Sequence, residues 1–182
     1  MEKKIFVTRR IPERGIELLK SKGYAVDVSE KDGVLAKDEL ITRLKEGAYD
    51  AVLCLLTDKI DEDVFAAAGP QCKVFANYAV GFDNIDLEAM RRHAMIVTNT
   101  PGVLTETVAE HTFALMLAIA HRIAEGDAYT KAGKYKGWAP MLLLGTDLAG
   151  KTLGVVGLGR IGSLVAHHAV KGFGMKVMYY DP

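Results

Sequence analysis

Short apolar runs alternate with helix-forming segments five times over the first hundred residues. KKIFVT, YAVDV, DAVLCLL, CKVFAN and MIVTN have the composition of strands, and segments with helical spacing separate them. After its first residue, DAVLCLL is apolar without interruption, which is typical of a strand buried on both faces of a parallel sheet. Chains that repeat strand and helix in this way form a parallel sheet with helices on both faces. We therefore predict an α/β domain whose ligands bind beyond the carboxyl ends of the strands.

A glycine-rich turn lies between two further predicted strands. GLGRIG places Gly157, Gly159 and Gly162 after the apolar run TLGVVG and at the start of a predicted helix. The run KVMYY follows, and then Asp181, which lies 19 residues after Gly162. A strand, a turn of this spacing, a helix, a second strand and an acid together predict a dinucleotide-binding βαβ unit. The alternative is a tight turn without a ligand, with Asp181 as a helix cap.

Each residue of the turn has a chemical role in that prediction. Gly157 allows the tight turn, Gly159 lets the backbone approach a pyrophosphate, and Gly162 lets helix and strand pack closely. Arg160 and Ile161 belong to the first helical turn, whose N–H groups and partial positive charge face the phosphates. All five are candidate cofactor-binding residues.

Asp181 decides which cofactor is expected. Its carboxylate can accept hydrogen bonds from both hydroxyls of the adenosine ribose. The same carboxylate would repel a 2′-phosphate, since like charges at close range disfavour each other. The sequence therefore predicts NAD rather than NADP.

Composition argues against several other classes of function. Lys plus Arg and Asp plus Glu each number 23, and the net charge is zero, so neither nucleic acid nor a membrane is an expected partner. Cys54 and Cys72 fit no metal or redox spacing, so we expect buried, reduced thiols and no metal site. The longest apolar stretch, FALMLAIA, is far short of a membrane span. The N-terminus has no signal-peptide pattern, and a cytoplasmic location is expected.

The segment between the two parts has a different pattern. Residues 104–124 are apolar almost all round, which predicts one long helix buried on several sides. Residues 126–149 contain Gly, Pro and Trp138 without periodicity, and they predict an irregular arm.

Four stretches, in order along the chain, carry a family resemblance. They are CLLTDKID, NYAVGFDNID, VTNTPGVLTETVAEHTFALMLAIAHRI and LGVVGLGRIG. Together they resemble the D-isomer-specific 2-hydroxyacid dehydrogenases, nearest the branch of the glyoxylate and hydroxypyruvate reductases. The resemblance implies a flavodoxin-like substrate domain over 1–100, then a hinge, long helix and dimerisation arm over 101–150. It assigns 151–182 to the first βαβ unit of an incomplete Rossmann domain that binds NAD.

The resemblance also implies an activity and its site residues. The activity is hydride transfer between NAD(H) and a small 2-oxo or 2-hydroxy acid such as glyoxylate or hydroxypyruvate. The backbone N–H groups of Val80 and Gly81 would hold the substrate carboxylate, and a glycine in a strand-to-helix loop does expose such donors to an anion. Leu55 matches a position that lines the substrate pocket, and Thr105 matches one near the cofactor.

The loop VGFDNID has a purely structural interpretation as well. Asp83 and Asn84 could form a turn, and Asp86 could cap the next helix. We expect Asp86 to act only as that cap.

The chain departs from the family in one respect. The family uses an Arg, a Glu and a His, all downstream of the first βαβ unit, and this chain has no counterpart for them. We therefore expect a truncated chain without catalytic residues of its own, inactive alone and assembled as a homodimer or larger homo-oligomer. The alternative is a stand-alone flavodoxin-like binding or interaction module whose C-terminal segment pairs with another chain.

Overall fold

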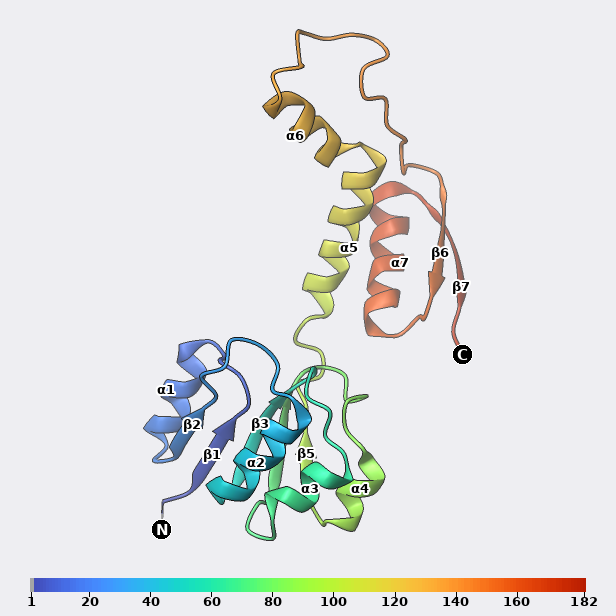
Figure 1. Ribbon diagram of the computed structural model, residues 1–182. Helices are drawn as coiled ribbons and strands as arrows, with labels where there is room; N and C mark the ends of the chain where they lie inside the picture. Colours follow the sequence, from blue (N-terminus) through green and yellow to red (C-terminus); the bar gives the residue numbers. More distant parts are fainter. Residues whose placement is uncertain (1) are drawn as a thin grey trace. The chain divides into compact units, whose positions relative to one another are not determined.

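The computed structural model describes residues 2–182, and the chain divides into two compact units. The first unit ends at Pro101 and the second begins at Gly102. A five-stranded sheet forms the first unit, and all of its neighbouring strands are parallel (Figure 1). The strand order is β2-β1-β3-β4-β5, with bounds β1 (Lys4–Val7), β2 (Ala25–Val28), β3 (Ala51–Leu55), β4 (Val74–Tyr78) and β5 (Ile96–Thr98). The predicted parallel α/β fold is confirmed.

Four helices cover the two faces of this sheet. They are α1 (Glu13–Ser21), α2 (Lys37–Gly47), α3 (Glu62–Ala68) and α4 (Leu87–Arg92). The chain steps outward from β1 to β2 and then returns across the sheet to β3, β4 and β5. Because parallel crossovers are right-handed, that reversal places α1 on one face and the other three helices on the opposite face.

The two faces have separate cores. Phe6, Val52 and Phe75 belong to the larger core, which includes buried residues of α2, α3 and α4. Ile5 and Val7 point to the other face and pack with the buried Ile16 of α1. Successive residues of a strand point to opposite faces, so this alternation follows directly from strand geometry.

On the face of the sheet that α1 covers, side chains become more exposed from the centre of the sheet toward β5. Ile5, Ala51, Val74 and Ile96 form one row of register partners across four strands. Ile5 is 9% exposed, whereas Ile96 at the other end of the row is 59% exposed. The edge strand β5 is therefore the least covered part of this face.

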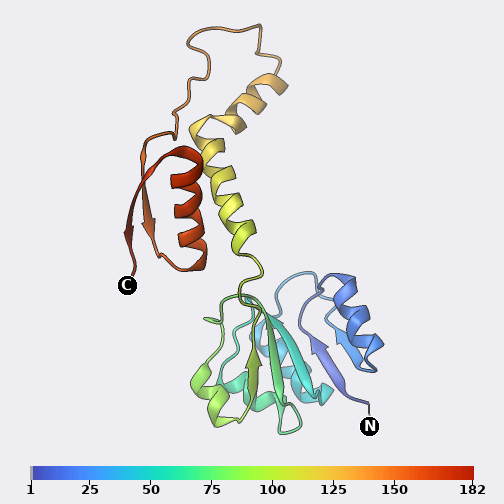
Figure 2. The same ribbon diagram turned by 180° about the vertical axis from the view of Figure 1, so that it is seen from behind.

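The second unit contains α5 (Thr105–Ala120), α6 (Ile123–Lys131), β6 (Thr152–Val156), α7 (Arg160–Phe173) and β7 (Lys176–Tyr180). β6 and β7 form a parallel pair, and α7 lies between that pair and α5 (Figure 2). Phe113 of α5 stacks on Phe173, with ring centroids 5.2 Å apart, and Val165 and Ala169 are buried in the same core. No helix in the described part of the chain has the length and apolar character needed to cross a membrane.

The prediction of one continuous helix over 104–124 is wrong. α5 ends at Ala120, Arg122 adopts a left-handed conformation (φ 54°), and α6 continues to Lys131 into the segment predicted as irregular. The break is stabilised from two sides. The N–H of Thr146 donates to the carbonyl of Ala120 (2.8 Å), and the Arg122 guanidinium donates to the Glu125 carboxylate (2.6 and 2.7 Å).

The helix is also less buried than its composition suggests. Only Ala109 and Phe113 of α5 are buried, and Ile119 is 78% exposed. The apolar character of residues 104–124 therefore does not correspond to burial within this unit.

Candidate functional site

The loop after β4 has its carbonyl groups fully engaged. Residues 79–82 each accept a hydrogen bond through the backbone carbonyl oxygen. The carbonyl of Ala79 accepts from the N–H (2.9 Å) and the Oγ1 hydroxyl (3.0 Å) of Thr100. The carbonyl of Val80 accepts from Asn99 Nδ2 (2.8 Å). The carbonyl of Gly81 accepts from Asn77 Nδ2 (3.0 Å), and the carbonyl of Phe82 accepts from the N–H of Ile85 (3.0 Å). The acceptor side of the loop is therefore bound to the protein.

The donor side of the same loop is open. Among the hydrogen bonds of residues 2–182, none uses the N–H of Val80 or of Gly81. Gly81 is exposed and Val80 is half-buried. The N–H of Phe82 has no partner among these hydrogen bonds either. Successive backbone donors that face no protein acceptor can bind an anion. A Cβ at Gly81 would meet only Asp83 Oδ2 at 3.5 Å, so the conformation of the loop does not itself require glycine there.

Leu55 lies at the end of β3, beside this loop, because its register partner Tyr78 is the last residue of β4. Its backbone is fixed at both ends. The N–H donates to Asp58 Oδ2 (2.8 Å), and the carbonyl accepts from Asn84 Nδ2 (3.1 Å). Asp58 is buried and also accepts from the hydroxyl of Thr8 (2.5 Å). The carboxyl ends of β1, β3 and β4 are thereby tied together.

Two asparagines connect Leu55 with the loop. Asn84 Nδ2 also donates to the carbonyl of Asp58 (3.0 Å), and Asn77 Nδ2 donates to Asn84 Oδ1 (3.1 Å). Asn77, Asn99, Asp58 and Thr8 were not among the predicted site residues, and Asn84 was considered only as a turn residue. The available signal was that Thr8, Asn77 and Asn99 are polar residues at the carboxyl ends of apolar strands.

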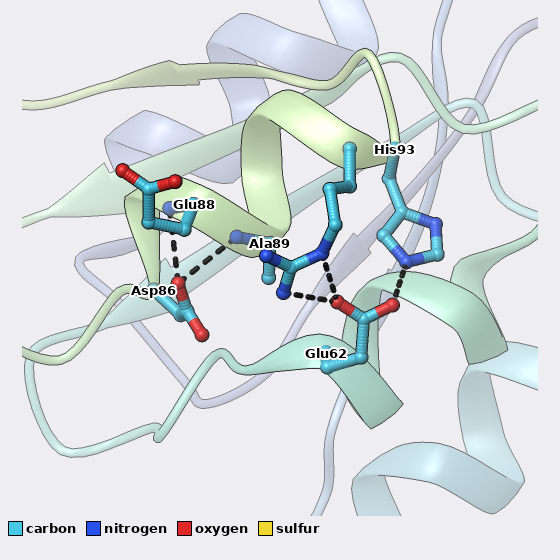
Figure 3. A network of polar contacts seen from close by, with 6 residues as sticks. Glu62, Asp86, Glu88, Ala89 and His93 are labelled. Atoms are coloured by element: carbon cyan, nitrogen blue, oxygen red, sulfur yellow. Dashed lines mark hydrogen bonds and ion pairs between the residues drawn. The ribbon is translucent and has the colours of Figure 1, made fainter.

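Asp86 caps α4, as predicted. Its Oδ1 accepts from the N–H groups of Glu88 (3.0 Å) and Ala89 (2.9 Å), which Figure 3 shows. The other end of α4 is linked to α3, since Glu62 accepts from Arg92 (2.6 and 3.0 Å) and contacts His93 Nε2 (2.5 Å). The hydrogen bonds from His93 and then Arg92 lower the pKa of the Glu62 carboxyl. The helix that follows the loop is therefore anchored at both ends.

The two cysteines are buried and reduced, as predicted. Burial, with a smaller contribution from the charge of Asp58, raises the pKa of the Cys54 thiol to about 12. Burial also raises the pKa of Cys72. Thiols with raised pKa values are poor nucleophiles, so both residues are structural. No group of His, Cys, Asp and Glu within residues 2–182 is arranged to hold a metal ion.

The glycine-rich turn of the second unit has a conformation that suits a dinucleotide. Gly157 has a φ of 89°, which favours glycine. A Cβ at Gly162 would lie 2.0 Å from the carbonyl oxygen of Gly157, so a side chain does not fit there. A Cβ at Gly159 would meet nothing within 4 Å, which leaves open space beside the backbone. No side chain caps the start of α7, so its first N–H groups remain available to an anion.

Asp181 lies beside this turn. Its Oδ1 accepts from the N–H of Leu158 (2.9 Å), and the N–H of Gly157 donates to the carbonyl of Tyr180 (2.8 Å). Leu158 precedes α7, so Asp181 does not cap that helix. The carboxylate is exposed, and its second oxygen accepts no hydrogen bond among residues 2–182. The turn, the uncapped helix and the acid together fit the adenosine and pyrophosphate parts of NAD.

The remaining candidates lie on the same unit. Arg160 is the first residue of α7, and Thr105 is the first residue of α5. Ile161 lines a hollow of about 480 Å³ between the turn and α5, together with Met116 and Gly157.

The chain is similar to known proteins in sequence and in fold. Residues 5–171 match the sequence model of a family described as "D-isomer specific 2-hydroxyacid dehydrogenase, catalytic domain". A glyoxylate reductase of Korarchaeum cryptofilum is 48% identical over 182 residues, which are all of this chain and 53% of the relative. The chain thus spans about half the length of the curated relatives it matches.

Solved structures resemble the chain over the same extent. The TT0316 protein of Thermus thermophilus aligns with a TM-score of 0.89 and 45% identity, over 97% of this chain and 55% of that one. A D-lactate dehydrogenase of Aquifex aeolicus, complexed with NAD and lactic acid, aligns with a TM-score of 0.78 and 29% identity. That alignment covers 98% of this chain and 51% of the other.

Proposed function

The chain belongs to the D-isomer specific 2-hydroxyacid dehydrogenase family, and we propose that it forms the carboxylate- and NAD-binding part of an oxidoreductase. The proposed reaction is hydride transfer between NAD(H) and a small 2-oxo or 2-hydroxy acid, with glyoxylate or hydroxypyruvate as the oxo acid. The observation that carries this proposal is the loop at 79–82. The protein engages its carbonyl groups and leaves the N–H groups of Val80 and Gly81 without a partner among the described residues.

In the substrate part of the proposal, those two N–H groups bind the carboxylate of the acid. Backbone donors held in place before binding lose little freedom when the anion arrives, which favours binding. Leu55 is proposed to border the same site, because it ends the strand adjacent to the loop. Its apolar side chain suits a small acid with few carbon atoms.

In the cofactor part of the proposal, the turn from Gly157 to Gly162 binds the pyrophosphate of NAD, and Asp181 binds the adenosine ribose. NAD, when bound, supplies the hydride acceptor or donor. The N–H groups at the start of α7, including those of Arg160 and Ile161, are oriented toward an anion by the helix itself. Thr105 is proposed to lie near the cofactor from its match to the family pattern alone.

We propose no residue of this chain as the catalytic acid or base. The 182-residue chain is therefore expected to bind both ligands without turning them over. The test is an NMR titration of the ¹⁵N-labelled chain with glycolate and then with NADH, alongside an assay of NADH oxidation by glyoxylate. Glycolate should shift the amide resonances of Val80 and Gly81 first, and NADH those of residues 157–162. A glycolate titration that moves no amide of residues 78–84 would show that the carboxylate site is wrong.

A second candidate function is an interaction module. The observation in its favour is the large exposed apolar side chains of residues 115–141, of which Ile119 is 78% exposed and Trp138 is 82% exposed. Exposed apolar groups of this size are typical of protein interfaces. An unchanged NMR spectrum with NADH and glycolate, together with self-association, would favour this function over the first.

A further inference from the structure

The direction of each free donor in the 79–82 loop is set by the carbonyl in the same peptide group. The described residues contain no cis peptide bond. In a planar trans peptide, the N–H points opposite to the carbonyl of the preceding residue. The group that holds the carbonyl of Ala79 therefore orients the N–H of Val80. Likewise, the group that holds the carbonyl of Val80 orients the N–H of Gly81.

The two carbonyls are held differently. That of Ala79 accepts two hydrogen bonds from Thr100, one from the backbone N–H (2.9 Å) and one from Oγ1 (3.0 Å). That of Val80 accepts one, from Asn99 Nδ2 at 2.8 Å, and no other donor among residues 2–182 reaches it. A single side chain therefore bonds the carbonyl that lies opposite the Gly81 N–H.

The sheet places this side chain. Asn99 directly follows β5, and β5 pairs in register with β4, where Ala76 faces Thr98. The Asn99 side chain is half-buried. Its amide therefore approaches the loop from a backbone held by the sheet rather than from a free surface. Asn77 cannot replace it, because its bond to the carbonyl of Gly81 orients the next N–H, that of Phe82.

We propose that Asn99 is a positioning residue of the carboxylate site. It does not touch the substrate, but it holds the Val80 carbonyl so that the Gly81 N–H points at the carboxylate. This inference rests on the proposed function, since it requires that a carboxylate binds at Val80 and Gly81. It adds the residue that determines whether the second of the two donors is available.

The first experiment compares Asn99→Ala with the unchanged chain by NMR titration with glycolate. Removal of one hydrogen bond that orients a binding group should weaken glycolate binding roughly tenfold. Before glycolate is added, the amide resonance of Gly81 should shift or broaden, whereas that of Val80 should not. Tyr49→Phe is the matched control, because it removes the part-buried hydrogen bond from Tyr49 to Asp27 elsewhere in the same unit. It should lower Tm without changing the Kd for glycolate or the Gly81 resonance.

The second experiment uses Asn99→Asp, which keeps the size of the side chain. At neutral pH the introduced carboxylate can only accept hydrogen bonds, so it repels the Val80 carbonyl and glycolate binding should fall. A carboxyl that faces a carbonyl has a raised pKa. Lowering the pH to about 5 therefore begins to restore a donor, and affinity relative to the unchanged chain should recover. A purely structural role for Asn99 predicts no such recovery.

The outcomes distinguish a failure of carboxylate binding at Val80 and Gly81 from a failure of the role of Asn99. If glycolate moves no amide near Val80 in the unchanged chain, the proposed function is wrong and the inference falls with it. If the unchanged chain binds glycolate and Asn99→Ala binds equally well with an unchanged Gly81 resonance, only the inference is wrong. If Asn99→Ala does not fold, the pH dependence of Asn99→Asp decides, and a flat affinity ratio overturns the inference.

Discussion

Gly162 and Gly159 lie in the same turn, but replacing each with alanine is expected to affect a different property of the chain. Gly162→Ala should affect stability, whereas Gly159→Ala should affect cofactor binding. At Gly162 the new Cβ would lie 2.0 Å from the carbonyl oxygen of Gly157, so the backbone must move. Gly162→Ala is expected to destabilise the second unit by about 2 kcal/mol, as overpacking against backbone does. Urea denaturation measures this loss, and Gly172→Ala is the control, because a Cβ there meets nothing within 4 Å. Equal stabilities of Gly162→Ala and the unchanged chain would contradict the close contact.

At Gly159 the expected effect falls on binding alone. Its Cβ would meet no protein atom within 4 Å, so Gly159→Ala should leave the free energy of unfolding unchanged. The added methyl group would occupy the space through which a pyrophosphate approaches the backbone. NADH titration followed by fluorescence should therefore show binding weakened roughly tenfold or more, a loss of about 1.4 kcal/mol. Unaltered NADH affinity would show that the pyrophosphate does not bind at this turn.

Asp181 should control the choice between NAD and NADP. Its carboxylate accepts from the N–H of Leu158, and the other oxygen accepts no hydrogen bond among residues 2–182. The unchanged chain is expected to bind NADH more tightly than NADPH, since a 2′-phosphate would meet a negative charge. Asp181→Ala should weaken NADH binding and narrow that difference. Parallel titrations with both cofactors measure it, and equal affinities in the unchanged chain would refute the role of Asp181.

At the level of helices, the link between α3 and α4 should depend on pH. Hydrogen bonds from His93 and Arg92 lower the pKa of the Glu62 carboxyl. A carboxyl whose pKa is lowered by folding adds stability above its unfolded pKa of about 4.3, and that stability is lost as the pH falls through the lower folded value. The hydrogen bond to Glu62 raises the pKa of Arg92, and the charges of Asp86 and Glu88 contribute less.

Glu62→Gln tests this pH dependence. At pH 7 the variant should be less stable than the unchanged chain in urea denaturation, because the charged hydrogen bonds are gone. As the pH falls below about 4.3, the difference should shrink toward zero. Glu88→Gln is a control, since its ion pair with Arg91 is exposed and lies within α4 alone. A stability difference for Glu62→Gln that stays constant down to the acid limit would argue against this link.

The strands were predictable from sequence, whereas the end of α5 was not. DAVLCLL is apolar at every position but its first because β3 is covered on both faces, and that pattern is local. The end of α5 is stabilised by the N–H of Thr146, which lies 26 residues after its partner Ala120. The apolar periodicity of residues 104–124 contains no information about a hydrogen bond from Thr146. The apolar pattern therefore continued past the position where the helix stops.

The same distinction applies to the candidate site. The turn from Gly157 to Gly162 could be recognised because its glycines and Asp181 belong to one continuous unit of fixed spacing. The side chains that hold the 79–82 loop come from separate strands, and Asn99 lies 19 residues from Val80. They meet only through the parallel register of β4 and β5, which the sequence does not specify residue by residue.

On the scale of the whole molecule, the exposed apolar residues predict self-association. Ile119 and Trp138 are both more than three-quarters exposed, and they lie on segments that follow the first unit. Identical exposed surfaces most often meet about a two-fold axis, so we predict a dimer or larger assembly with residues 104–182 as most of the interface. Sedimentation at micromolar concentration tests it, and Ile119→Lys should shift the equilibrium toward the monomer. A monodisperse monomer in which residues 151–182 resist protease would overturn the prediction.

The falling burial along the row from Ile5 to Ile96 implies a gradient of local opening. Edge strands with little apolar cover unfold locally most easily, so the amide protons of β5 should exchange with deuterium faster than those of β1 and β3. Asn99 directly follows β5, and each opening of this strand would release the Val80 carbonyl. A carboxylate bound at Val80 and Gly81 should therefore slow exchange at Ile96–Thr98, residues that it never touches. Hydrogen exchange with and without glycolate would reveal this remote protection as a thermodynamic coupling between the ligand and the least stable strand of the sheet.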